Sequence, residues 1–173
     1  MKRIALLSVV LLIMFGSEKL SAQNKITGKI KIEIALPVTV AESEPLNFGK
    51  IINNVDGGTV IISPTGIREC TGNVRGFGND FHSAGKFIIT GPPNLLLDLS
   101  LPRGDQFILS ETGGMKMIVR DFVSSPPEAT QIYIPNQEGK LELGIGATLY
   151  VSNWLANPPG IYTGIYEIAI TYN

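Results

Sequence analysis

The sequence predicts an all-β protein with an immunoglobulin-like β-sandwich fold, and three observations lead to this prediction. Apolar residues alternate with polar ones or stand in short runs, which is the pattern of strands. No stretch keeps the period of a helix. The 19 glycines and 11 prolines fall mostly between the apolar runs, where turns are expected. A small closed barrel is the alternative architecture.

The expected strands follow each other at short intervals along the chain. The first, at 26–34, alternates strictly between isoleucine or glycine and polar residues. Further strands are expected at 46–52, 59–63, 86–90, 95–101, 106–110, 116–122, 131–134, 140–151 and 161–172. Asp56-Gly57 is typical of a hairpin turn, and 106–110 is expected to pair with 116–122 around 112–114. Residues 71–85 are interpreted as a long loop, and Gly144-Ile145-Gly146 as a bulge or a close approach of two backbones.

The first 22 residues are typical of a secretory signal peptide. Lys2 and Arg3 precede an apolar run of about 12 residues at 4–15, and small residues end at Ala22. A membrane-spanning helix needs about 20 residues, so this run is too short for an anchor. We expect export to the periplasm, cell surface or medium, with a signal peptide at 1–22, an N-terminal strand at 23–35 and one sandwich domain at 36–173.

Charge and hydropathy exclude two classes of partner. With 14 basic and 15 acidic residues, the chain lacks the basic stripe of a nucleic-acid-binding protein. No second long apolar segment follows the signal peptide, so no membrane span is expected after its removal.

The residues do not predict an enzyme or a bound cofactor. Cys70 and His82 are the only cysteine and the only histidine, too few for a zinc site, an internal disulfide or a catalytic triad. Cys70 is interpreted as an incidental thiol rather than a reactive one. A glycoside hydrolase, which needs two carboxylates, remains a remote alternative. Its candidates are scattered over separate elements: Asp98, Asp105, Asp121, Glu142 and Glu167.

Three aromatic residues in loops make a ligand site conceivable. Phe77 and His82 lie in the glycine-rich stretch at 76–83, and Trp154 lies between the last two strands. Aromatic rings stack on sugars, although they also plug the ends of sandwiches. A self-contained secreted domain that binds a ligand, such as a surface glycan, is therefore the main alternative to a structural role.

Short motifs follow each other in order along nearly the whole mature chain. They are Leu46-x-Phe48-Gly49, Gly58-Thr59-Val60 with Ser63-Pro64, Phe87-x-x-Thr90-Gly91, Gly146-Ala147-Thr148-Leu149 and Pro159-Gly160-x-Tyr162-x-Gly164. In these motifs the chain resembles the bacterial secreted family called domain of unknown function 4402. The resemblance implies no activity.

The two ends of the mature chain are also similar to those of chaperone–usher pilins. Such pilins end in an alternating strand with a penultimate tyrosine and an upstream glycine, as Tyr172 and Gly160 do here. They begin with an alternating extension that completes the sandwich of the next subunit. The resemblance implies a strand donor at Ile26, Gly28, Ile30, Ile32 and Ile34, and a strand acceptor at Gly160, Tyr162, Tyr166, Ile168, Ile170 and Tyr172.

The expected function is therefore that of an exported fibre subunit, with itself or a related subunit as its partner through strand addition. Two observations weigh against this expectation. Residues 26–34 have the same pattern if they form the first strand of their own domain. Most such pilins also carry a disulfide, which one cysteine cannot form.

Overall fold

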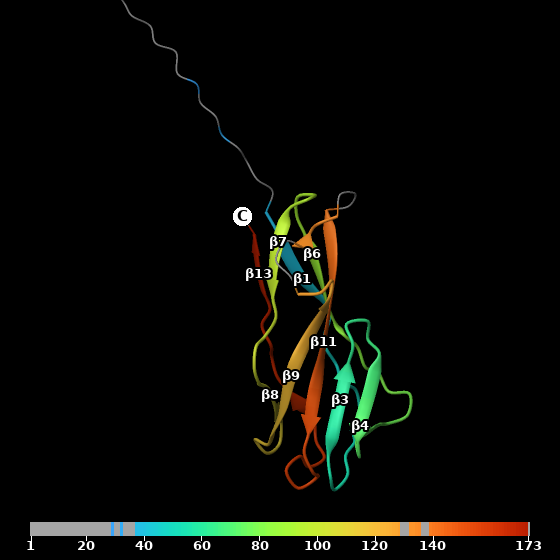
Figure 1. Ribbon diagram of the computed structural model, residues 1–173. Helices are drawn as coiled ribbons and strands as arrows, with labels where there is room; N and C mark the ends of the chain where they lie inside the picture. The colour runs from blue at the N-terminus through green and yellow to red at the C-terminus, as the bar shows by residue number, and fades with distance from the viewer. Residues whose placement is uncertain (1–28, 30–31, 33–36, 129–131, 136–138, 173) are drawn as a thin grey trace, which may run out of the picture. The chain divides into compact units, whose positions relative to one another are not determined.

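The computed structural model describes residues 29, 32, 37–128, 132–135 and 139–172, and Figure 1 shows its strands. All regular secondary structure in these residues is β-strand, so the predicted all-β class is confirmed. Residues 35–173 form one compact unit. Within the described part of the chain, no helix is long and apolar enough to cross a membrane.

The strands of this unit form two sheets and a short ribbon. The largest sheet runs in the order β1-β6-β11-β9-β8-β12, with β3 paired to β11 and β4 paired to β3; a second sheet runs β10-β7-β13, and β2 pairs with β5. The bounds are β1 Thr39–Glu44, β2 Ile51–Ile52, β3 Gly58–Ile62, β4 Arg68–Gly72, β5 Arg75–Gly76, β6 Gly85–Thr90, β7 Leu96–Ser100, β8 Gln106–Ser110, β9 Lys116–Ser125, β10 Ile132–Tyr133, β11 Lys140–Val151, β12 Tyr162–Thr163 and β13 Ala169–Tyr172.

The long strand β11 connects the two halves of the large sheet. Its first half pairs with β6 and its second half with β3, while β9 runs along its other edge. Gly146 allows this arrangement, because a Cβ there would lie 2.7 Å from the carbonyl carbon of Ser63. A register shift between Gly146 and Thr148 adds a bulge. Of the two alternatives expected at 144–146, the close backbone approach is present there, and the bulge lies just after it.

Two apolar clusters form the core. In the first half of β11, Leu143 and Ile145 pack with Leu97 and Leu99 of β7, so the two sheets cover each other there. In its second half, Ala147, Leu149 and Val151 pack with residues of β3 and β9, together with the half-buried Phe48 and Tyr162. The second cluster is the one that positions the candidate site.

Several expectations about single strands are wrong. The expected strand at 161–172 is divided into β12, which pairs with β8, and β13, which pairs with β7 in the other sheet. The Asp56-Gly57 turn exists, but the strands beside it do not pair, because β2 pairs with β5 and β3 with β11 and β4. The expected loop at 71–85 contains β5. The hairpin of β8 and β9 is confirmed.

Candidate functional site

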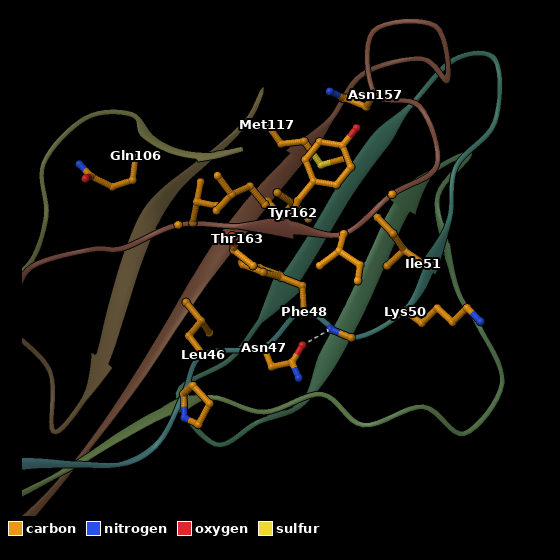
Figure 2. A pocket seen from close by; sticks show the side chains of 18 of the residues that line it. Leu46, Asn47, Phe48, Lys50, Ile51, Gln106, Met117, Asn157, Tyr162 and Thr163 are labelled. Atoms are coloured by element: carbon orange, nitrogen blue, oxygen red, sulfur yellow. Dashed lines mark hydrogen bonds between the residues drawn. The ribbon is translucent and has the colours of Figure 1, made fainter. Parts of the chain in front are cut away.

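A groove of about 1290 Å³ lies over the second apolar cluster. Residues 45–53, which follow β1, form one side, and residues 158–166, which include β12, form the other. Figure 2 shows Leu46 and Phe48 on the first side and Tyr162 and Thr163 on the second. The groove is thus bounded by two extended segments that lie far apart in the sequence.

The floor of the groove is apolar. The sheet beneath it contributes inward side chains from β8, β9 and β11, because alternate residues of these strands face the same side. These side chains are Ile108, Met117, Val119, Phe122 and Leu149. An apolar floor favours the binding of a ligand that has an apolar face.

On the first side of the groove, residues 46–50 form a rim, which we call the first rim. Its backbone is already hydrogen-bonded within the domain. Asn47 and Ser83 exchange two backbone hydrogen bonds of 2.9 Å. The backbone amide of Gly49 donates to Asn47 Oδ1, the amide of Lys50 donates to Asp80 Oδ2, and Lys50 O accepts from the amide of Phe77. This rim has few backbone groups left for a ligand.

A buried ion pair fixes this rim from behind. Arg68 Nη1 and Nη2 donate to the two carboxylate oxygens of Asp80 at 2.9 and 2.8 Å, and Arg68 Nη1 also donates to Phe48 O. Both side chains are largely inaccessible, with exposed fractions of 9% and 12%. The hydrogen bonds from Arg68, helped by the amide of Lys50, hold the pKa of Asp80 well below its usual range.

The second side of the groove, which we call the second rim, includes a stretch whose backbone has no partner among the described residues. On one side, β12 pairs with β8, and the amide of Glu111 donates to Ile161 O. The stretch from Gly164 to Ile168 joins β12 to β13 and makes no backbone hydrogen bond to any other described residue. Gly164 packs tightly on β8, where an added Cβ would lie 2.7 Å from Phe107 O. A backbone edge of this kind is a template for another strand.

Aromatic packing closes one end of the groove. The Tyr166 ring lies 5.3 Å from the Phe122 ring and 6.3 Å, edge to face, from the Phe87 ring. Its hydroxyl is buried and has no hydrogen-bond partner among the described residues. Burial, with a smaller effect of Glu42, raises the pKa of Tyr166 to about 12. Beyond this closed end, the second sheet covers the first.

The other end of the groove is open and carries exposed aromatic residues. Trp154 and Phe77 both line this region and are each about half exposed. Lys50 Nζ lies 4.5 Å above the Phe77 ring. Asn157 holds the loop of Trp154 in place, because its amide accepts from Ser152 N and donates to Lys116 O. Of the three residues expected in a ligand loop, Phe77 and Trp154 thus line the groove.

The remaining predicted residues have varied positions. Ile26, Gly28, Ile30 and Ile34 lie outside the described residues, and Ile32 is 80% exposed. Among the acceptor candidates, Gly160, Tyr162 and Tyr166 line the groove, whereas Ile168 and Ile170 pack on the core beyond it and Tyr172 is half exposed.

The other candidates lie away from the groove. His82 does not line it, and its ring forms a hydrogen bond of 3.3 Å with Asp80 O. Cys70 is half-buried in β4. The five scattered carboxylates also lie outside the groove lining, and among the described residues no group of three potential ligands could hold a metal ion.

The sequence reasoning missed the first rim and its ion pair. The alternation of Leu46 and Phe48 signals an inward-facing strand, but it does not show that this strand borders a groove. Arg68 and Asp80 lie 12 residues apart in a stretch that was interpreted mainly as loop, and no local pattern links them.

Comparison with known proteins agrees with the ordered motifs. No curated protein and no solved structure matches the chain. One family model matches residues 38–172, which include every strand described above. The chain therefore belongs to the family described as Domain of unknown function (DUF4402).

Proposed function

We propose that this protein is an exported, non-enzymatic structural subunit that builds a surface fibre by β-strand addition. In this proposal, residues 26–34 of one copy occupy the groove of the next copy. The observation that carries the proposal is the stretch Gly164–Ile168, whose backbone has no partner among the described residues and whose first three residues border the apolar floor. An added strand supplies hydrogen bonds to such an edge, while its alternate side chains fill the floor.

The N-terminal segment has the chemistry that this groove requires. Ile26, Ile30, Ile32 and Ile34 share one face with Gly28, and polar side chains share the other. Burial of four isoleucine side chains contributes roughly 1.5–3 kcal/mol each, or about 6–12 kcal/mol as an upper estimate. This burial favours association and acts together with the backbone hydrogen bonds of an added strand.

The direct test is an electrophoresis experiment on residues 23–173, the chain without its predicted signal peptide. Fibres joined by strand addition should give a ladder of bands in denaturing gels when the sample is not boiled. The ladder should disappear on boiling, and it should be absent from a chain that lacks residues 23–34. A monomer band that unfolds cooperatively, with or without those residues, would contradict the proposal.

Substitution of the donor face sharpens this test. Ile30→Asp with Ile32→Asp should abolish the ladder, because two carboxylates cannot enter the apolar floor without a large desolvation cost. The matched control places the same residue on the opposite face, as Lys29→Asp with Lys31→Asp, and should keep the ladder. If both double variants lose the ladder to the same extent, the alternation of the donor segment plays no part in assembly.

A second candidate function is a secreted domain that binds a surface glycan. It is favoured by Phe77 and Trp154, which lie at the same end of the groove with half-exposed rings. A glycan array probed with residues 35–173 should be blank for a pure fibre subunit. Specific binding that Trp154→Ala abolishes would support this second function instead.

A further inference from the structure

The open end of the groove carries more apolar surface than an added strand needs. Four side chains that line this end are about half or more exposed, and we call them the open-end patch: Ile52, Phe77, Trp154 and Ile161. Monomeric proteins rarely expose clustered apolar side chains of this size without a partner.

A second apolar patch lies at the end of the domain where β1 begins. Thr39 pairs with Thr90, and β7 starts a few residues after Thr90. Leu96 pairs with Tyr133 there, and Tyr172 pairs with Leu97. We call the exposed side chains in this group the β1-end patch: Leu96, Tyr133 and Tyr172.

The short connecting chain limits the distance between the β1-end patch of one copy and the open-end patch of the next. Only residues 35–38 separate the donor segment from β1. From Ile34 to Thr39 the chain therefore spans at most about 18 Å. A copy whose residues 26–34 lie in a neighbour's groove must hold its β1 end close to the place where the segment leaves that groove.

The closed end of the groove determines at which end the donor segment leaves the groove. Tyr166, Phe87 and Phe122 fill that end, and the second sheet covers the core beyond it. The connecting residues must therefore pass out at the open end, next to Trp154. Ile26 then lies near Tyr166 and Ile34 near Pro158, so that the donor runs antiparallel to residues 158–166.

We propose that the β1-end patch of the donor copy docks on the open-end patch of the acceptor copy. The partner is thus a second copy of this chain, and the inference rests on the strand addition proposed above. Because the two patches differ, the contact is head to tail, and repetition gives an open chain of subunits instead of a closed dimer.

The experiment separates docking from strand addition. The first readout is the affinity of a synthetic peptide of residues 24–35 for residues 35–173, which form a compact unit of their own. The second is the dissociation rate of fibres of residues 23–173, followed by the loss of the unboiled ladder. Tyr133→Asp removes part of the β1-end patch and touches neither the groove nor the donor segment. Ile67→Asp is the matched control, since Ile67 and Tyr133 are both 62% exposed.

We expect Tyr133→Asp to leave peptide affinity unchanged and to speed fibre dissociation by roughly tenfold, because interface substitutions act mainly on dissociation. Ile67→Asp should change neither readout.

Three results would overturn the inference. In the first, Tyr133→Asp fibres dissociate as slowly as the Ile67→Asp control. In the second, Trp154→Asp abolishes glycan binding while assembly stays unchanged, which assigns the open-end patch to a glycan. In the third, the peptide does not bind unsubstituted residues 35–173, which also removes the proposed function.

Discussion

At the scale of single residues, the shape of the groove depends on one buried ion pair. Arg68 and Asp80 come from β4 and from the loop before β6, and together they hold Phe48 and Lys50 through backbone groups. A bidentate pair in this position orients the rim as well as stabilising it. If one partner is removed, the other is left as an uncompensated charge.

The variant Arg68→Gln should therefore lose more thermal stability than Arg103→Gln, whose side chain is 81% exposed. The pH dependence of the free energy of unfolding tests the same ion pair more specifically. The pKa of Asp80 is lowered in the folded state, so its contribution is present above its unfolded pKa of about 4 and is lost as the pH falls below that value. Urea unfolding between pH 3 and 7 should show this loss in the unsubstituted protein and a weaker one in Arg68→Gln. Parallel pH profiles would contradict this role.

Tyr166 gives a second prediction, on the alkaline side. Its hydroxyl is buried without a described partner, which costs about 1–3 kcal/mol. Tyr166→Phe should therefore raise the free energy of unfolding, by about 1 kcal/mol. Because its pKa is raised to about 12, ionisation of this hydroxyl leaves the free energy of unfolding unchanged below pH 10. The free energy of unfolding falls as the pH rises from about 10 to 12, because the hydroxyl ionises first in the unfolded chain.

Chemical unfolding at pH 8 and at pH 11 measures both effects. Tyr166→Phe should lose less stability than the unsubstituted protein between these two values. Tyr150→Phe is the control, since the Tyr150 hydroxyl is exposed and already donates to Asp121. An unchanged alkaline loss in Tyr166→Phe would show that this hydroxyl does not titrate in that range.

At the scale of elements, alternation and turn residues predicted the strands that have a clear inner and outer face. The hairpin of β8 and β9 and the long strand β11 follow their patterns closely. Strand β1 was missed because Thr39–Glu44 is mostly polar and almost fully exposed, so it has no apolar face to detect. Strand β4 was missed for a similar reason, since Arg68–Gly72 is largely polar.

The last strand shows what alternation alone does not determine. Tyr162, Tyr166, Ile168 and Ile170 all face inward, as their spacing indicates. The chain nevertheless leaves one sheet at β12 and enters the other at β13, because its partners β8 and β7 belong to different sheets. Pairing partners depend on contacts between distant residues. Local sequence therefore could not show that the stretch between the two sheets lacks a backbone partner among the described residues.

At the scale of the whole domain, the groove follows from incomplete coverage of the large sheet. The second sheet covers the first half of β11, whereas residues 45–53 and 158–166 are the main segments that border the floor over the second half. The sequence pattern singles out Tyr162 and Tyr166 on one side of this floor. It could not predict the opposite rim, because the two sides meet only through the fold.

The measurement that tests the central claim most directly is residue-level amide hydrogen exchange of residues 35–173, with and without the peptide of residues 24–35. Strand addition predicts new protection within Gly164–Ile168, whose amides have no described backbone partner, and little change at Gly49 and Lys50, whose amides are already bonded. The peptide should also raise the stability of the domain, by about 2.7 kcal/mol at a hundredfold excess over its Kd. Unchanged exchange at Gly164–Ile168 under saturating peptide would contradict the account.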